Sequence, residues 1–315
     1  MAGVGPLILV VSPNTGIDIT YEVTGFATGR VNRAARQEPM IGGKPVNVVR
    51  TLARLGVGAE VFTFCDSAHL PFLRRELGAL DAVCHVTPAG RALRYCSIVV
   101  DARAKTSTVV NGPGPLIEES EAGRFLQNVE NALAQDGHRY LVLSGSLPPG
   151  LPDDTYGKLV RAAKKYGKYA VVDAAGAVLR EAAGASPDLG KVNEEEFGVL
   201  AAGRTVDVAA LEYLDRIGTL IVTAGAAGAV CYHGGRRYQV EPLGGFEPVN
   251  PTGCGDAFLG GYVAGLVRGY PVPECLRLAN AAAYANLLDL LPDIGNHVDK
   301  IRLFEKNTVV RETVL

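Results

Sequence analysis

The sequence lacks an excess of charge of either sign. Its 31 Lys and Arg residues nearly balance 33 Asp and Glu residues, which leaves a formal net charge of −2 over 315 residues. So small a net charge gives no general attraction for nucleic acid or for an anionic membrane surface. We therefore expect neither as a partner. A basic cluster at 161–168 stands where a helix is expected to end, a place that favours positive charge without any ligand.

Metal-binding and disulfide patterns are missing as well. The five histidines include no H-E-x-x-H pair. The cysteines form no C-x-x-C pair and are widely spaced, which argues against a zinc site or a disulfide framework, at Cys65, Cys84, Cys96, Cys231, Cys254 and Cys275. The N-terminal apolar run from Pro6 to Val11 is too short for a signal peptide or a membrane span. We therefore expect a protein of the reducing cytoplasm.

Two common nucleotide-binding signatures are absent. No G-x-G-x-x-G follows the first apolar run, which argues against a dinucleotide-binding dehydrogenase. No G-x-x-x-x-G-K-[ST] occurs either, because Gly43-Lys44 is followed by Pro45. The sequence thus excludes a P-loop enzyme.

What is present is a regular alternation of short apolar runs and helical patterns. The runs at 7–11, 59–64, 140–143, 169–173 and 219–223 are typical of buried strands. Between them, apolar side chains recur on one helical face, as at Val48, Val49, Leu52 and Leu55. This alternation predicts an α/β fold with a central, mostly parallel sheet and helices on both faces. We find no repeat and no linker, so we expect a single domain over residues 1–315.

Two segments interrupt the alternation. Residues 17–36 and 94–110 are rich in strand-forming side chains, with no convincing helical pattern within them. We expect them to form a small antiparallel β lid, set apart from the main sheet. An antiparallel extension at the edge of the main sheet is the alternative.

Glycine-rich turns follow several of the apolar runs. They lie at 41–47, 144–150, 223–228 and 249–256, and in an open parallel sheet such turns line one crevice at the carboxyl ends of the strands. The last turn, Gly253-Cys254-Gly255-Asp256, leads into a helical segment, and a helix N-terminus is a favourable site for an anion. A plain helix-capping role for Asp256 is the alternative.

The order of these motifs resembles that of the ribokinase-like PfkB family of carbohydrate kinases, in particular its 1-phosphofructokinase and tagatose-6-phosphate kinase branch. The resemblance runs from about residue 7 to residue 290. It is carried by Gly16-Ile-Asp-Ile-Thr20, Val31-Asn-Arg33, Gly42-Gly-Lys44 with Asn47, Asn111-Gly-Pro-Gly-Pro115, Ser144-Gly-Ser-Leu-Pro-Pro-Gly150, Asn193-x-x-Glu196, Thr223-x-Gly-x-x-Gly228 and Gly253-x-Gly-Asp256.

The resemblance implies a role for most of the matched positions. Asp256 would be the general base, and Gly253, Cys254 and Gly255 would hold the transferring phosphoryl group. The sugar phosphate would be bound by Asp18, Gly43, Lys44, Asn47, Arg94, Ser144 and Arg33. For Arg33, an exposed charge on the lid is the alternative. Pro45 stands where the family usually has glycine, so any role of that backbone amide is lost.

The resemblance also implies ATP and Mg²⁺ as co-substrate and cofactor. Thr223, Gly225 and Gly228 would contact ATP, and Asn280 would lie near the adenine. Asn193 would contact the nucleotide and, with Glu196, hold Mg²⁺ through water. Cys254 replaces the commoner alanine or serine. A thiol at a helix N-terminus can be reactive, with simple space filling as the alternative.

The resemblance makes fructose 1-phosphate the expected substrate, converted to fructose 1,6-bisphosphate. Tagatose 6-phosphate and fructose 6-phosphate are the alternatives, followed by an unphosphorylated sugar or nucleoside. A non-catalytic sugar-phosphate sensor is a further alternative. The resemblance also suggests a homodimer formed through the lid.

Overall fold

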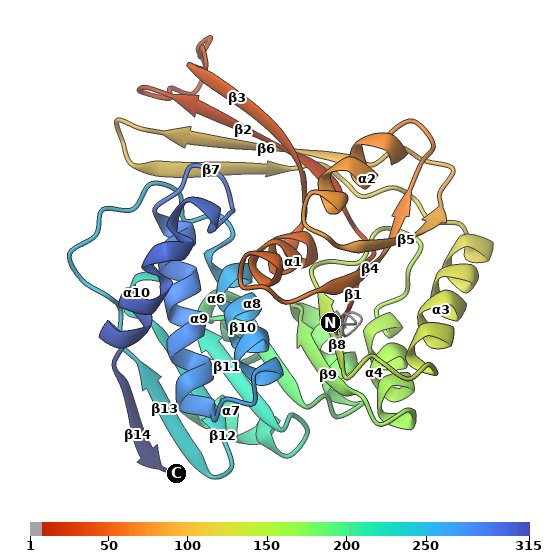
Figure 1. Cartoon of the computed structure of the whole chain (residues 1–315), viewed down its shortest axis with the longest axis vertical. Helices are drawn as coiled ribbons and strands as arrows, with labels where there is room; N and C mark the ends of the chain where they lie inside the picture. Colours follow the sequence, from red (N-terminus) through yellow and green to blue (C-terminus); the bar gives the residue numbers. More distant parts are fainter. Residues whose placement is uncertain (1–7, 202) are drawn as a thin grey trace, which may run out of the picture.

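A ten-stranded sheet runs through the molecule in the computed structural model, which describes residues 8–201 and 203–315 (Figure 1). Seven neighbouring strands are parallel, in the order β5 (Val83–Pro88), β4 (Ala59–Cys65), β1 (Ile8–Ser12), β8 (Tyr140–Ser144), β9 (Tyr169–Asp173), β10 (Leu189–Asn193) and β11 (Thr219–Thr223). Three antiparallel strands extend the edge beyond β11, namely β12 (Ala229–His233), β13 (Arg236–Val240) and β14 (Val310–Val314). The predicted strands and the mostly parallel sheet are confirmed. Position 7 of the first predicted strand lies outside the described residues.

Helices cover both faces of this sheet, as predicted. One face packs against α1 (Lys44–Arg54), α2 (Leu70–Gly78), α8 (Cys254–Val267), α9 (Val272–Leu287) and α10 (Ile301–Asn307). The other face packs against α3 (Glu119–Leu133), α4 (Thr155–Lys165), α5 (Gly176–Ala183), α6 (Glu194–Ala201) and α7 (Val206–Leu214).

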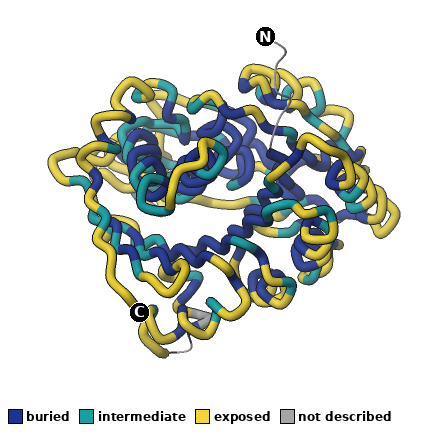
Figure 2. The backbone as a smooth tube through the Cα atoms, turned by 60° about the horizontal axis from the view of Figure 1, so that its bottom comes forward, coloured by how far each residue is buried: buried dark blue, intermediate teal, exposed yellow. Residues whose placement is uncertain are grey.

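Side-chain alternation along the strands produces two separate hydrophobic cores. In β1, Ile8 and Val10 belong to the first core, whereas Leu9 and Val11 belong to the second. All four side chains are fully buried, and Figure 2 shows the buried backbone concentrated in the interior, with exposed turns at the rim. Burial on both faces explains why such a strand appears in the sequence as an unbroken apolar run.

The lid is a second sheet of four strands that projects from the main body (Figure 1). Its order is β3 (Arg36–Gly42), β2 (Gly16–Val23), β6 (Arg94–Asp101) and β7 (Thr106–Asn111). The prediction of a separate sheet is confirmed, but a wholly antiparallel sheet was wrong, because β2 and β6 pair in parallel. These strands follow β1 and β5, two parallel strands of the main sheet, so both leave that sheet in the same direction. The lid also extends past the predicted limit at 36, since β3 begins there.

The chain reverses its direction of sheet growth between β1 and β8. After β1, it adds β4 and β5 on one side, and it then adds β8, β9, β10 and β11 on the other. Ligands in open α/β sheets bind at the carboxyl ends of the strands beside such a switch point. Within the described residues, no helix has both the length and the apolar character needed to cross a lipid bilayer.

Candidate active site

A cleft of about 1470 Å³ lies at the carboxyl edge of the parallel strands, where the lid meets the first turns of α1 and α8. Its lining includes all but one of the site residues predicted from the sequence: Asp18, Gly43, Lys44, Asn47, Arg94, Ser144, Asn193, Glu196, Thr223, Gly225, Gly228, Gly253, Cys254, Gly255, Asp256 and Asn280. The exception is Arg33, which is exposed on the connection between β2 and β3 and does not line this cleft.

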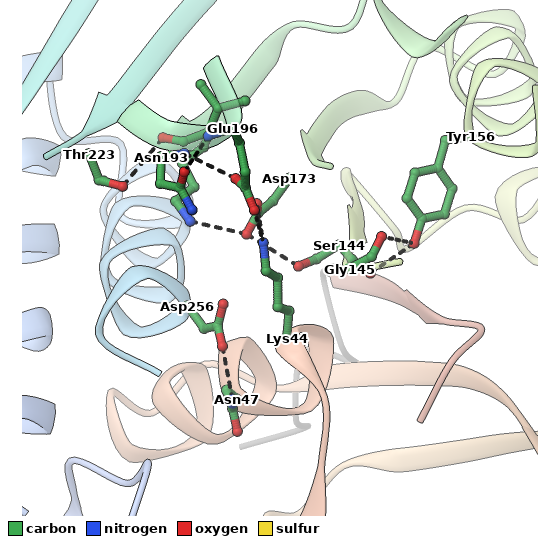
Figure 3. Close-up of polar contacts among 12 residues, drawn as sticks. Lys44, Asn47, Ser144, Gly145, Tyr156, Asp173, Asn193, Glu196, Thr223 and Asp256 are labelled. Atoms are coloured by element: carbon green, nitrogen blue, oxygen red, sulfur yellow. Dashed lines mark hydrogen bonds and ion pairs between the residues drawn. The ribbon is translucent and has the colours of Figure 1, made fainter. Parts of the chain in front are cut away.

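Asp256 lies in the first turn of α8, directly after a turn that only glycine suits. The N-cap residue Gly253 has a left-handed φ of 84°, and a Cβ there would stand 2.7 Å from Cβ of Pro292. The Asp256 side chain is 6% exposed and makes no capping bond. Its Oδ2 instead accepts a hydrogen bond of 2.8 Å from Nδ2 of Asn47 on α1 (Figure 3). The capping alternative is therefore wrong, and the carboxylate faces the cleft.

The pKa of Asp256 is raised to about 6. Burial is the main cause, since it disfavours the charged carboxylate, and the nearby Asp173 carboxylate acts in the same direction. Lys191, Lys44 and the Asn47 hydrogen bond oppose the rise. A carboxylate with a pKa near 6 is ionised at neutral pH and is still basic enough to accept a proton from a hydroxyl group.

Two lysines share a buried carboxylate at the floor of the cleft. Nζ of Lys191 lies 3.2 Å from Oδ2 of Asp173, and Nζ of Lys44 lies 3.5 Å from its Oδ1. Burial acts to raise the pKa of Asp173, but the two ammonium groups outweigh it and hold the pKa below its usual value. Burial acts to lower the pKa of Lys44, and Asp173, Asp256 and Glu196 together raise it. Lys44 is therefore charged at neutral pH.

Asn193 and Glu196 fix the turn between β10 and α6. Oδ1 of Asn193 accepts a hydrogen bond of 2.6 Å from the Glu196 amide, and Oε2 of Glu196 accepts one of 3.1 Å from the Asn193 amide. The second carboxylate oxygen, Oε1, lies 2.9 Å from Nζ of Lys44. No group of three or more side chains suited to hold a metal occurs within the described residues. Oxygen atoms of this kind fit a hydrated Mg²⁺, which keeps most of its water ligands.

Residues 191–193 end β10, and α6 begins at Glu194. Lys191 lies within β10 and is 3% exposed, so its side chain is buried. Asp173 is the last residue of β9 and pairs in register with Lys191. Neither was predicted as a site residue, although a charged residue at the carboxyl end of a predicted strand was an available signal for Asp173.

The lid side of the cleft holds a carboxylate beneath an arginine. Asp18 is 8% exposed; burial raises its pKa, against the opposing effects of Arg94, Cys96 and the Gly43 amide. A Cβ at Gly42 would overlap the Asp18 carboxylate at 1.9 Å, so glycine is required there. Nε of Arg94 is buried without a hydrogen-bond partner, as expected of a group that binds an anion.

The far side of the cleft is largely apolar. Thr223 ends β11, and its hydroxyl donates to the Val192 carbonyl oxygen at 3.3 Å. Nδ2 of Asn280 donates to Oγ1 of Thr308 at 3.1 Å, which ties this side chain to the protein. Sequence patterns missed the apolar side chains that line this side, namely Leu243, Phe246, Ala283, Tyr284 and Leu287. These side chains come from a loop and from α9, and together they form an apolar surface suited to the flat base of a nucleotide.

Two departures from the family pattern now have a structural explanation. Pro45 lies in the first turn of α1, where no intrahelical acceptor is available for an amide, so the helix tolerates it. Burial raises the pKa of the Cys254 thiol to about 12, so the possibility of a reactive thiol was wrong. The Ser144 hydroxyl is fully buried and donates to Oδ2 of Asp173 at 3.4 Å.

These groups define a class of site. A helix N-terminus, two ammonium groups and a buried carboxylate of raised pKa converge on one cleft, as phosphoryl transfer requires, because that reaction depends on positioning and on offsetting negative charge.

Comparison with known proteins gives the family. Residues 8–292 match the pfkB family carbohydrate kinases, and the chain belongs to that family. A 1-phosphofructokinase of Rhodobacter capsulatus is 32% identical over 305 residues, which cover 92% of each chain. A tagatose-6-phosphate kinase of Staphylococcus epidermidis is 27% identical over 292 residues, or 90% of this chain and 93% of the relative.

Solved structures share the fold. Escherichia coli phosphofructokinase-2 in complex with substrates and products superposes with a TM-score of 0.86 at 23% identity, covering 95% of this chain and 99% of that one. A nucleoside kinase of Methanocaldococcus jannaschii gives a TM-score of 0.73 at 17% identity, covering 96% and 99%. The predicted ribokinase-like fold is confirmed.

Proposed function

We propose that this protein transfers the γ-phosphoryl group of ATP to a hydroxyl of fructose 1-phosphate, forming fructose 1,6-bisphosphate. The observation that carries the proposal is Asp256, a buried carboxylate whose pKa is raised to about 6 and which stands in the first turn of α8. The R. capsulatus relative, a 1-phosphofructokinase, supports the choice of acceptor.

The reaction begins with the acceptor hydroxyl between Asp18 and Asp256. Asp256 accepts the hydroxyl proton as the sugar oxygen attacks the γ-phosphorus, and the bond from that phosphorus to the bridging oxygen of ADP breaks. The backbone amides at the start of α8 and the ammonium groups of Lys44 and Lys191 offset the negative charge on the phosphoryl oxygens. Magnesium supplies further charge neutralisation when bound, and Asn193 and Glu196 would hold it through water.

The lid supplies the group that distinguishes a phosphorylated sugar. Nε of Arg94 is buried without a partner beside Asp18, and a guanidinium binds phosphate through charge-assisted hydrogen bonds. Arg33 stays a predicted ligand that would have to approach from outside the cleft, because the side chain is exposed on the β2–β3 connection.

The test is a coupled ADP-release assay with fructose 1-phosphate, tagatose 6-phosphate, fructose 6-phosphate, free fructose and nucleosides. Removing a hydrogen bond to a charged group costs about 1.5–3 kcal/mol, so Arg94→Ala should lower kcat/KM for the sugar phosphate by roughly 10- to 100-fold. Activity on free fructose should change little. Arg103→Ala is the matched control, since Arg103 is an exposed lid arginine outside the cleft.

Other outcomes decide between the alternatives. A higher kcat/KM for tagatose 6-phosphate would replace the proposed acceptor with that of the S. epidermidis relative. A preference for free fructose, or an equal loss on phosphorylated and free sugars in Arg94→Ala, would contradict the phosphate-binding role. Binding of the sugar phosphate with no ADP release from any acceptor would favour the sensor.

We also propose a homodimer formed through the lid. The edge strand β7 leaves apolar side chains in solvent, with Val109 43% and Val110 63% exposed, and an unpaired strand edge can pair with a second chain. A tetrameric inhibited form is known for E. coli phosphofructokinase-2, which shares the fold. Sedimentation should show a dimer that Val110→Asp dissociates, whereas a monomer at micromolar concentration with substrate present would contradict the proposed dimer.

We propose a cytoplasmic location as well. The six cysteines are all free thiols, as is usual for proteins of a reducing compartment.

A further inference from the structure

Arg50 is a buried cation on α1 that no sequence motif pointed out. It is 4% exposed, and three acceptors surround its guanidinium. Nη1 donates to Oδ1 of Asn47 at 2.8 Å and to the carbonyl oxygen of Pro292 at 3.3 Å, while Nη2 donates to the carbonyl oxygen of Ile41 at 2.8 Å. One side chain therefore joins the end of a lid strand, α1 and the loop after α9.

The contact with Asn47 determines which way its amide points. A guanidinium can only donate hydrogen bonds, so the amide atom that faces Arg50 must be the oxygen. The NH₂ group is then directed to the opposite side, where Nδ2 donates to Oδ2 of Asp256 at 2.8 Å. Because Oδ2 is engaged in this way, Oδ1 is the carboxylate oxygen left to accept a proton.

The contact with Pro292 supports the neighbouring turn. The Pro292 ring lies so close to Gly253 that a Cβ on that glycine would stand 2.7 Å from Cβ of the proline. Gly253 is the N-cap of α8, which carries Asp256. Arg50 can therefore affect the position of Asp256 in two ways. It orients the Asn47 amide, and it supports the loop next to the N-terminus of α8.

We propose that Arg50 is a positioning residue for phosphoryl transfer, which orients the Asn47 amide so that Asp256 presents Oδ1 to the acceptor hydroxyl. The inference rests on the proposed role of Asp256 as the base. Arg50 itself does not line the cleft. The other charged groups that act on Asp256 are Lys44 on α1, Asp173 on β9 and Lys191 on β10. Those that act on Arg50 are Asp293, Asp18, Glu76 and Arg54.

The first test is Arg50→Met. Without the guanidinium, the Asn47 amide can turn its oxygen toward Asp256, which favours the protonated carboxyl. We expect the acidic limb of the kcat profile to move to higher pH. Small misplacements of reacting groups can cost about 100-fold, so kcat at pH 7 should fall by roughly 10- to 100-fold, with little change in KM for ATP.

Arg54→Met is the matched control, since Arg54 lies one helical turn further on and pairs with Asp293 in the same loop. This variant should keep the wild-type limb and kcat. An unshifted acidic limb and unchanged kcat in Arg50→Met would overturn the proposal, even if the melting temperature fell.

A double-mutant cycle tests the route through Asn47. If Arg50 acts mainly through that amide, Arg50→Met should lower kcat less in an Asn47→Ala background than in wild type, whereas the same fold loss in both backgrounds would overturn the proposal. Should Arg50→Met fail to fold, Arg50→Lys provides the second variant, because lysine keeps a buried cation that cannot bridge all three acceptors. If the acidic limb of the kcat profile of Arg50→Lys moves part of the way to higher pH, the proposal is supported. If this limb does not move, the proposal is overturned. Asp256→Asn separates the two levels: if it retains turnover, the proposed base itself is wrong.

Discussion

Replacing Asp256 with asparagine should remove activity and stabilise the protein at the same time. The two side chains have the same shape, and the asparagine oxygen can still accept the hydrogen bond from Asn47. A positioned general base contributes about 10²- to 10⁴-fold to a reaction, so kcat should fall by that order. Binding of the sugar phosphate should change little, because Asp18 and Arg94 are intact.

The stability gain follows from the raised pKa. The pKa of Asp256 is about 6 in the folded protein, against 3.8 for an ordinary aspartate. Ionisation of this carboxylate therefore destabilises the folded state. A difference of about two pKa units corresponds to about 3 kcal/mol at neutral pH. The native state binds the proton more tightly than the unfolded chain, so this destabilisation develops as pH rises from 3.8 to 6. The advantage of asparagine should therefore be full above pH 6 and absent below pH 4.

Two measurements check this reasoning. Urea unfolding of both proteins between pH 4 and pH 8 gives the difference in free energy of unfolding, and the ADP-release assay gives kcat over the same range. Wild-type kcat should fall about tenfold per pH unit below 6, as expected for loss of an essential base. A variant that is less stable than wild type at neutral pH, or a difference that does not vary with pH, would refute the account of the buried carboxylate. A kcat within tenfold of wild type would refute its role as base.

Two further substitutions test neighbouring groups. Asp173→Asn leaves the buried ammonium of Lys191 without its carboxylate, and breaking a buried ion pair costs about 3–5 kcal/mol, measurable by urea unfolding. The same change should move the acidic limb of kcat to lower pH, because the Asp173 charge raises the pKa of Asp256. Gly253→Ala places a Cβ against Pro292 at a φ of 84°, so it should lower the free energy of unfolding by about 1–3 kcal/mol or more. It should also lower kcat, because it displaces the start of α8. Thermal unfolding and the ADP-release assay would detect these effects, and wild-type values in both would show that the glycine turn is not needed.

The parts of the fold that the sequence predicted well are those where local pattern and burial agree. Strands such as β4 and β9 are buried on both faces, so they appear as continuous apolar runs. The glycine turn before α8 was recognisable because its backbone needs a left-handed residue. In contrast, β10 reads LGKVN, with a glycine and a lysine in five residues, and β5 is a partly exposed edge strand. Neither carries the apolar pattern that predicts a strand.

The missed site residues depend on contacts between distant parts of the chain. A single arginine on a helix face is typical of an exposed surface, and Arg50 is buried only because the loop at Pro292, 242 positions away, folds over α1. The parallel pairing of β2 and β6 likewise depends on the order of strands in the main sheet. No local pattern contains this information, because it is created when the two sheets and α1 assemble.

The electrostatic design of the cleft resolves two conflicting demands. Phosphoryl transfer needs positive charge beside the reacting group, but two lysines close to Asp256 would lower the pKa of the carboxylate and weaken it as a base. Asp173 lies beneath both ammonium groups and shares their charge, within 3.2 Å of Lys191 and 3.5 Å of Lys44. It keeps Lys44 protonated and also raises the pKa of Asp256 through its own negative charge. Because Asp173 is fully buried and held below its usual pKa, its charge stays fixed while Asp256 gains and loses a proton. The strength of the proposed base therefore depends on a carboxylate that takes no proton itself.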